Sequence, residues 1–230
     1  MEKDSPAEVI GFDQSAYAKR QEGCSPDAIR AAVWQLIETE VGGHVLDAGS
    51  GNGGWIRWLQ KSSRIQSLAS VDLVDDGPGA MPGVNFKLVD LSKEALPFPG
   101  DSLDWISAIE VLEHLANPRN FVMEAGRTLK LGGKFVISTP SNDSIRAKAS
   151  FVLRGYFPAF CEHDYVGSGH ITTIFVHDLR RMAKEAGFKG IEFHFPLPGR
   201  LPMLKWEWQS FLPFCRGQAW SDVLIAVLTK

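Results

Sequence analysis

The sequence predicts an α/β fold in which parallel strands alternate with helices. Short apolar segments alternate four times with stretches of helical spacing, an order that implies parallel strands joined by right-handed crossovers. A glycine-rich turn, Asp47 to Gly54, joins the first strand to its helix. Acidic residues close successive strands, and ligands of such sheets bind at the carboxyl ends of the strands. We therefore expect one ligand crevice at that edge.

The composition indicates a globular protein of one domain. The chain has 230 residues, of which 44% are hydrophobic and 22% charged, enough for a sizeable core. Its net charge of −3 gives no general attraction to nucleic acid. Cys24, Cys161 and Cys215 are too scattered for a disulfide framework or a C-x-x-C metal site. We expect a cytoplasmic protein, because no apolar run could span a bilayer and the N-terminus lacks a signal-peptide core.

The first 40 residues are predicted to form an N-terminal helical cap. Residues 1–24 are polar and have no clear period, so a flexible arm or a lid over the site is expected. Ser25 and Pro26 are a helix start, with serine at the N-cap and proline in the first turn. Helical spacing of apolar residues continues to about Thr39. Tyr17 could reach a ligand, although a packing role is the favoured interpretation.

The turn after the first predicted strand, His44 to Ala48, has the properties of a ligand-binding loop. Gly49, Gly51 and Gly53 allow the backbone to take positive φ and to approach a ligand that a Cβ would block. The helix that starts near Trp55 offers its unpaired N–H groups at the same place. Asp47 can fix the loop and accept hydrogen bonds from a cationic or N–H-bearing ligand.

The glycines alone do not identify the ligand, and two other interpretations of the turn stay open here. Gly49-x-Gly51-x-x-Gly54 also fits the dinucleotide fingerprint, and Asp72 lies near the expected ribose position. A nicotinamide-dependent oxidoreductase is therefore one alternative, and a purely structural turn is another. Asp72 closes the second predicted strand, 67–71, where its carboxylate can accept both ribose hydroxyls or, alternatively, cap the next turn.

The sequence resembles the class I S-adenosylmethionine-dependent methyltransferases, in particular the type 11/type 23 group that is similar to ubiquinone-biosynthesis O-methyltransferases. The glycine turn matches the family's D-x-G-x-G-x-G motif at Asp47 and the three glycines that follow. The phrase L-P-F-x-x-x-S-x-D, from Leu96, and the L-K-x-G-G turn, from Leu129, are further family marks. The resemblance covers roughly residues 25–140.

The resemblance implies a Rossmann-like three-layer sandwich with a seven-stranded, mostly parallel sheet and an antiparallel last strand between strands five and six. It also implies S-adenosylmethionine as cofactor. Asp90, after the third strand at 84–89, would meet the adenine amino group, and Leu91 would pack on the ring. The dinucleotide family has no such demand, so Asp90 argues against the oxidoreductase. The implied cofactor-binding residues are Asp47, Gly49, Gly51, Gly53, Asp72, Leu73, Asp90, Leu91 and Glu110.

The remaining elements follow from periodicity and turn residues. Strand four (105–109) precedes a helix that starts at Asn117 and Pro118, and strand five covers 134–138. The later part contains predicted helices at 144–155 and 177–186, an irregular stretch at 156–169, and strands at 188–195 and 223–228. We expect a cofactor core at 41–140, a variable substrate region at 141–221 and the last strand within 222–230, all in one domain.

The motif Glu110-x-x-Glu113-His114 is the candidate for handling the acceptor. On a helical turn, Glu110 would lie beside both Glu113 and His114, and His170 could add another ligand. Such a set suits a divalent cation like magnesium. It resembles the E-x-x-E-H motif that holds magnesium or a similar ion in ubiquinone-biosynthesis and small-RNA 2′-O-methyltransferases. Without metal, Glu110 would shape the pocket, and His114 would cap the loop or, like His170, act as a general base.

These observations favour methyl transfer from S-adenosylmethionine to an oxygen of a small-molecule, sugar or lipid-linked acceptor. RNA is disfavoured because the chain is acidic and lacks a basic stripe. A non-catalytic S-adenosylmethionine-binding protein is the other alternative.

The aromatic segment 196–221 has three interpretations. It could cover the sheet edge, which we favour, line a substrate pocket or dimer surface, or contact a membrane surface together with the basic segment at 144–155. Its large aromatic residues include Trp206, Trp208, Phe211, Phe214 and Trp220.

Overall fold

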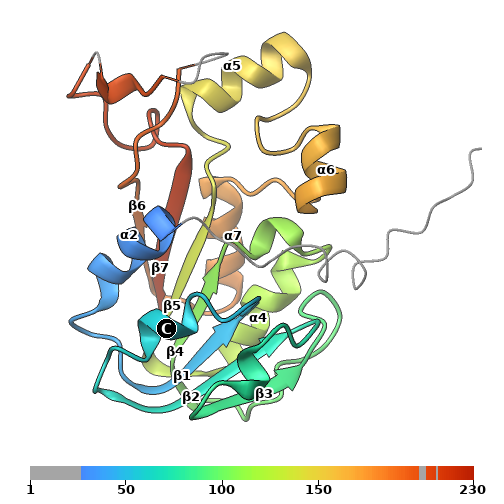
Figure 1. Ribbon diagram of the computed structural model, residues 1–230, viewed down its shortest axis with the longest axis vertical. Helices are drawn as coiled ribbons and strands as arrows, with labels where there is room; N and C mark the ends of the chain where they lie inside the picture. The colour runs from blue at the N-terminus through green and yellow to red at the C-terminus, as the bar shows by residue number, and fades with distance from the viewer. Residues whose placement is uncertain (1–26, 202–205, 211) are drawn as a thin grey trace, which may run out of the picture.

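The computed structural model describes residues 27–201, 206–210 and 212–230 (Figure 1). Several features of the sequence analysis lie outside these residues. They are the predicted arm, the helix start at Ser25 and Pro26, and the residues Tyr17, Cys24 and Phe211. The strands are β1 (Gly43–Ala48), β2 (Ile65–Asp72), β3 (Val84–Leu88), β4 (Leu103–Ile109), β5 (Leu129–Pro140), β6 (Gly190–His194) and β7 (Val223–Thr229). The helices are α2 (Asp27–Ile37), α3 (Ile56–Leu59), α4 (Pro118–Thr128), α5 (Ile145–Arg154), α6 (Glu162–Ser168) and α7 (Val176–Glu185). Short 3₁₀ helices are η1 (Pro78–Ala80), η2 (Leu112–His114) and η3 (Trp208–Ser210).

The strands form one seven-stranded sheet in the order β3-β2-β1-β4-β5-β7-β6. The pairs among β1 to β5 are parallel, whereas β7 runs antiparallel to both of its neighbours, β5 and β6. The predicted fold class is therefore confirmed, including the antiparallel last strand between strands five and six.

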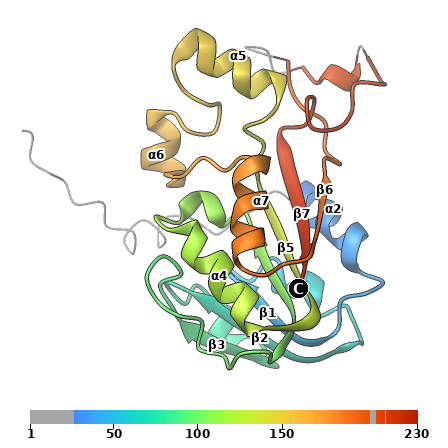
Figure 2. The same ribbon diagram turned by 180° about the vertical axis from the view of Figure 1, so that it is seen from behind.

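Helices cover both faces of the sheet, which gives the three layers seen in Figures 1 and 2. Side chains alternate across a strand, so neighbours such as Val45 and Leu46 belong to different cores. Leu46 packs in the core that contains the buried faces of α4 and α7, and Val45 packs in the core beneath α2 and α3. Both faces of the central strands are buried, as their continuous apolar runs require.

Two helix boundaries follow directly from the sequence. The Asn117 side chain caps α4, where its Oδ1 accepts from the N–H of Asn120 at 3.2 Å and Pro118 occupies the first turn. After α7, Gly187 takes φ +84, a left-handed conformation that glycine adopts without a Cβ penalty.

The helix after the glycine turn begins next to Trp55, as predicted, and has four residues in α3. The structure corrects two other local predictions. The L-K-x-G-G segment lies inside β5, where the pairing with β4 shifts register and Gly132 donates its N–H to the carbonyl of Lys230. The stretch predicted as irregular contains α6, whose first turn is capped when the Asp164 carboxylate accepts from the N–H of Cys161 at 3.1 Å.

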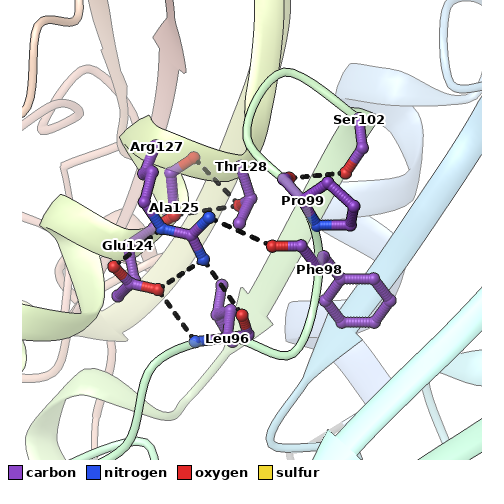
Figure 3. Close-up of polar contacts among 8 residues, drawn as sticks. All are labelled: Leu96, Phe98, Pro99, Ser102, Glu124, Ala125, Arg127 and Thr128. Carbon is purple, nitrogen blue, oxygen red and sulfur yellow. Dashed lines mark hydrogen bonds and ion pairs between the residues drawn. The ribbon is translucent and has the colours of Figure 1, made fainter.

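A clamp around Arg127 holds the loop before β4 at the amino-terminal edge of the sheet (Figure 3). Its guanidinium donates to the carbonyls of Leu96 (3.0 Å) and Phe98 (3.1 Å) and to the Glu124 carboxylate (2.7 Å). Glu124 in turn accepts from the N–H of Leu96 at 2.9 Å. The L-P-F segment is therefore a structural part of this fold, far along the strands from the carboxyl edge.

A cap formed by residues 141–175, 196–201, 206–210 and 212–221 stands beyond the carboxyl ends of the strands (Figures 1 and 2). One oxygen of Asp222, just before β7, accepts from Arg146 at 2.9 Å and from Arg200 at 3.2 Å, which ties both parts of the cap to the sheet. Within the described ranges, no helix is long and apolar enough to cross a membrane. The predicted division into core and variable regions stays a prediction.

Candidate functional site

The acidic residues predicted to share an edge do so. Asp47 lies near the end of β1, Asp72 ends β2, Asp90 follows β3 and Glu110 follows β4. Because these four strands are parallel, their carboxyl ends meet at the same edge of the sheet.

The glycine positions of the turn after β1 are shaped so that a side chain there would be strained or would clash. Gly49 and Gly53 both have φ +75, where any other residue is strained. A Cβ at Gly49 would lie 2.5 Å from Cγ2 of Val111, and one at Gly53 would lie 2.5 Å from the sulfur of Met81. Gly51, with φ +48, sits between them, and its N–H points to Asp72. The turn thus brings bare backbone up to the acidic edge.

Asp72 is held in place by backbone N–H groups. One carboxylate oxygen accepts from Gly51 at 2.7 Å, and the other accepts from Leu73 at 2.6 Å. Burial raises the pKa of this carboxyl, and the N–H bonds partly oppose that rise. The carboxylate therefore does cap the following turn, but each oxygen keeps acceptor capacity for a further donor such as a ribose hydroxyl.

Three buried polar atoms near the glycine turn have no hydrogen-bond partner among the described residues. They are Oδ2 of Asp47, Oγ of Ser50 and Nε1 of Trp55. The other oxygen of Asp47 accepts from Ser107 at 3.0 Å, and burial raises the pKa of this aspartate to about 7. Unsatisfied groups of this kind are uncommon in folded proteins. Such a set beside the glycine turn fits a bound polar ligand.

Sequence reasoning missed Arg30. This arginine is buried on α2, where its guanidinium lies so close to Gly54 that a Cβ there would come within 2.7 Å of Cζ. It pairs with Asp27 at 2.9 Å, and its charge lowers the pKa of Asp47. A usable signal was present, since Arg30 follows Ile29 and precedes Val33 by three residues on the face predicted to be apolar.

The two residues expected near adenine, Asp90 and Leu91, interact with other parts of the protein. Asp90 accepts from the N–H of Ser92 at 2.9 Å and pairs with Lys93 at 2.9 Å. Leu91 is buried in the core shared with α4 and α7. Asp90 is thus positioned at the edge, whereas Leu91 also carries a packing role.

Glu110 departs from the predicted helical turn. It takes a left-handed conformation, φ +56, and η2 begins only at Leu112. Its N–H donates to the carbonyl of Ser138 at 3.0 Å, and its Oε1 accepts from the Ser138 hydroxyl at 2.8 Å. Burial raises the pKa of this carboxyl to about 7. Positive φ in a residue other than glycine is a strained state that clusters at functional sites.

Glu113, His114 and His170 come together as a possible metal cluster, and Glu110 lies outside it. One ligand atom from each of the three residues lies within 4.8 Å of the others. Glu113 is fully buried, and its Oε2 accepts from the Thr139 hydroxyl at 3.0 Å. Within the part of the chain that the structure describes, its Oε1 has no hydrogen-bond partner. Burial, together with the charge of Glu110, raises the pKa of Glu113.

The two histidines are arranged as neutral rings. Nδ1 of His114 lies 3.2 Å from the carbonyl of Gly169, and Nδ1 of His170 lies 2.7 Å from the carbonyl of Ala159. These contacts favour the tautomer with the proton on Nδ1 and the lone pair on Nε2. Burial, helped by the charge of His170, lowers the pKa of His114 to about 4, and burial also lowers that of His170.

The cap loop is fastened to the motif by backbone hydrogen bonds. The carbonyl of Glu113 accepts from the N–H groups of Ile171 (2.9 Å) and Thr172 (3.0 Å). The Thr172 hydroxyl donates to the carbonyl of Leu115 at 2.6 Å. This attachment explains how His170, distant in sequence, reaches Glu113 and His114.

Comparison with known proteins identifies relatives of this chain by sequence. The sequence profile of a methyltransferase domain family matches residues 17–192. A ubiquinone biosynthesis O-methyltransferase from Thiobacillus denitrificans is 27% identical over 159 residues, which is 67% of this chain and 64% of that protein. A demethylmenaquinone methyltransferase from Tropheryma whipplei is 29% identical over 136 residues, 56% of this chain and 50% of that one. The chain thus spans less than two thirds of the length of these curated relatives.

Solved structures show the same fold. A SAM-dependent methyltransferase from Archaeoglobus fulgidus superposes with a TM-score of 0.66 at 16% identity, covering 92% of this chain and 97% of that one. A Haloferax volcanii putative methyltransferase, solved in complex with the Trm112 methyltransferase activator, gives a TM-score of 0.61 at 18% identity and covers 94% and 97% of the two chains.

Proposed function

The chain belongs to the methyltransferase domain family, as a class I S-adenosylmethionine-dependent methyltransferase, and from this premise we propose that it methylates an oxygen atom of a small-molecule, sugar or lipid-linked acceptor. The observation that carries the cofactor assignment is the carboxylate of Asp72, held by the N–H groups of Gly51 and Leu73 next to the glycine turn. A related O-methyltransferase, at 27% identity, supports oxygen as the acceptor atom.

We assign the cofactor to the glycine turn and the acidic edge. Asp72 would accept the ribose hydroxyls, Asp90 the adenine amino group, and the partnerless oxygen of Asp47 a donor of the ligand. Gly49 and Gly53 take positive φ and let the turn backbone pack against Val111 and Met81, which keeps the turn close to the acidic edge. The full proposed set is Asp47, Gly49, Gly51, Gly53, Asp72, Leu73, Asp90, Leu91 and Glu110, to which the structure adds Arg30 as a buried cation beside the turn.

Methyl transfer to a hydroxyl oxygen has three requirements that the protein must meet. The methyl group on a sulfonium is already activated, so the protein must align the acceptor with it, exclude water and remove the hydroxyl proton. His114 and His170 supply neutral imidazoles beside the acidic edge, and a neutral imidazole is the form that accepts a proton. Glu110, held by Ser138, would shape the pocket next to them.

We further propose that Glu113, His114 and His170 hold a divalent cation such as magnesium. The cluster combines a carboxylate oxygen that has no hydrogen-bond partner among the described residues with two neutral imidazoles whose Nδ1 atoms face carbonyls. Magnesium prefers oxygen ligands, so a transition-metal ion such as Mn²⁺ fits this mixed set better. When bound, the cation would contact vicinal oxygens of the acceptor and lower the pKa of a hydroxyl. Glu110 is left out of the ligand set, since its carboxylate turns toward Ser138.

The first test is calorimetric titration with S-adenosylmethionine, S-adenosylhomocysteine and, as a control, NAD. Asp72→Ala should weaken binding of both S-adenosyl compounds about 100-fold or more, because two hydrogen bonds to a charged group are lost. Asp76→Ala is the matched control, since it removes an exposed carboxylate a few residues along the same loop. Equal affinity in the wild type and D72A would contradict the assigned site, and binding of NAD alone would favour the oxidoreductase.

The cation is tested by titrating the protein with Mg²⁺ and Mn²⁺ without acceptor, so that the readout is metal binding itself. Glu113→Gln keeps an acceptor for Thr139 but removes the charged ligand, and binding should fall about tenfold or more. Glu110→Gln, a matched change in the neighbouring carboxylate, should not weaken metal binding, because Glu110 lies outside the cluster. If the two variants bind alike, or if the wild type binds neither ion, the metal-free general base replaces this proposal.

A further inference from the structure

The described part of the chain concentrates its exposed apolar side chains on the cap. Apart from Leu88, Met123 and Leu131, all of its exposed large hydrophobic side chains belong to the cap. They are Ile145, Phe151, Val152, Leu153, Tyr156, Tyr165, Val166, Trp206, Leu212 and Phe214. A cluster of this kind at one end of a molecule marks an interaction surface.

The C-terminal end of α5 projects from the body of the protein. Every residue from Phe151 to Tyr156 is exposed, although consecutive residues on a helix point in different directions. Val152 is 80% exposed and Leu153 66% exposed. Figure 1 shows this helix at the far end of the molecule, beyond the carboxyl ends of the strands. The end of α5 thus presents apolar groups on several sides to whatever lies above the cap.

The aromatic segment contributes to the same end. Trp208 and Trp220 pack edge to face with ring centroids 4.7 Å apart, and a covering role for this segment stays a prediction. Phe214, in contrast, is 79% exposed on the loop that lies at the same end of the molecule as α5 in Figure 1. The N–H of Ile145 donates to the carbonyl of Ala219 at 2.9 Å, which connects that loop to the start of α5.

The charged residues within α5 are all positive. The segment from Ser144 to Cys161 contains Arg146, Lys148 and Arg154 and no acidic residue, in a chain whose net charge is −3. Arg146 pairs with Asp222, whereas Lys148 and Arg154 are exposed and have no ion-pair partner among the described residues. Apolar side chains flanked by unpaired cations match an anionic lipid surface, where the apolar groups enter the boundary region and the cations meet headgroups.

We propose that the cap docks this protein on an anionic lipid bilayer through the end of α5 and the Phe214 loop. The docked face belongs to the same cap that supplies His170 to the candidate site. This inference goes beyond the proposed methyl transfer and does not depend on it, because vesicle binding is measured without cofactor or acceptor.

The experiment is co-sedimentation of the full chain with vesicles of phosphatidylcholine alone or mixed with phosphatidylglycerol. The wild type should bind the anionic vesicles about tenfold or more better than the neutral ones. The double variant V152S/L153S should weaken that binding about tenfold or more, because two apolar side chains no longer enter the bilayer. Leu131→Ser is the matched control, since Leu131 is 77% exposed at the opposite edge of the sheet, and it should bind as the wild type does.

A second variant separates charge from apolar contact. Arg154→Gln should weaken binding to anionic vesicles several-fold and leave binding to neutral vesicles unchanged. The proposal is overturned if the wild type does not sediment with anionic vesicles, or if V152S/L153S and L131S bind equally. It is also overturned if the wild type instead self-associates in a way that V152S/L153S abolishes, which would make the surface a contact between two copies. Urea unfolding of each variant confirms that these exposed substitutions leave the fold intact.

Discussion

The pKa values of carboxyl groups are shifted in opposite directions at the two edges of the sheet. At the amino-terminal edge, Glu124 pairs with Arg127 and Asp104 pairs with Lys130. The Arg127 guanidinium lowers the pKa of Glu124, and the His44 N–H and the Lys130 ammonium overcome burial to lower that of Asp104. At the carboxyl edge, burial raises the pKa values of Asp47 and Glu113, and each keeps one oxygen without a hydrogen-bond partner.

We infer that carboxylates at the amino-terminal edge stabilise the fold, whereas those at the carboxyl edge serve ligand binding or the reaction. Carboxylates whose pKa is lowered in the folded state stabilise it above their unfolded pKa, and that contribution is lost as the pH falls. Carboxylates whose pKa is raised destabilise the fold increasingly as the pH rises through the same region. A protein retains such costly buried groups where they meet a ligand or carry out a reaction.

The largest expected effect comes from Asp47→Asn at the carboxyl edge. The pKa of Asp47 rises from 3.8 to about 7, so the folded state binds the extra proton between roughly pH 4 and 7 and wild-type stability falls across that window. Asparagine still accepts from Ser107 but does not ionise, so above pH 7 it should be more stable by up to about 4 kcal/mol.

Urea unfolding at a series of pH values measures this effect. The stability difference between D47N and the wild type should vanish near pH 4 and grow toward pH 7. A difference that stays constant across that range would mean that Asp47 ionises normally, and the contrast between the two edges would fail.

A second prediction compares one glycine from each edge. Gly49→Ala should cost about 3 kcal/mol, because left-handed strain adds to a Cβ that would lie 2.5 Å from Val111. Gly132→Ala, at the amino-terminal edge, has the similar φ of +78 but nothing within 4 Å, so it should cost only about 1 kcal/mol. Urea unfolding of both variants measures the difference, and equal losses would show that crowding at the glycine turn does not matter.

The smallest effect is expected in the Arg127 clamp. Arg127→Ala removes hydrogen bonds to two loop carbonyls and should lower the free energy of unfolding by about 1–2 kcal/mol. Affinity for S-adenosylmethionine should be unchanged, because the clamp lies at the opposite edge. Arg119→Ala is the control on the same helix, since its exposed ion pair with Glu185 should contribute below about 1 kcal/mol. A loss of cofactor affinity in R127A would show that the two edges are coupled.

The first half of the candidate site was predictable because its parts are local in sequence. Asp47, the glycines and Asp72 follow a strand–turn–helix–strand order, so alternation of apolar segments was enough to place them at one edge. Arg30 was missed since a buried cation on an amphipathic helix looks like a surface residue. Glu110 was misplaced because spacing alone suggested a helical turn, whereas the bonds to Ser138 on β5 favour a left-handed backbone.

The sequence by itself determined the alternation of strands and helices, the turn that only glycines can form, and the acidic ends of the strands. These features depend on backbone sterics and periodicity, which act over a few neighbouring residues. Only the tertiary structure decided that His170 joins Glu113 and His114 and that the apolar end of α5 remains uncovered. Both outcomes depend on how the cap packs across the carboxyl edge, through contacts such as Glu113 with Ile171 and Arg146 with Asp222, between residues distant in sequence.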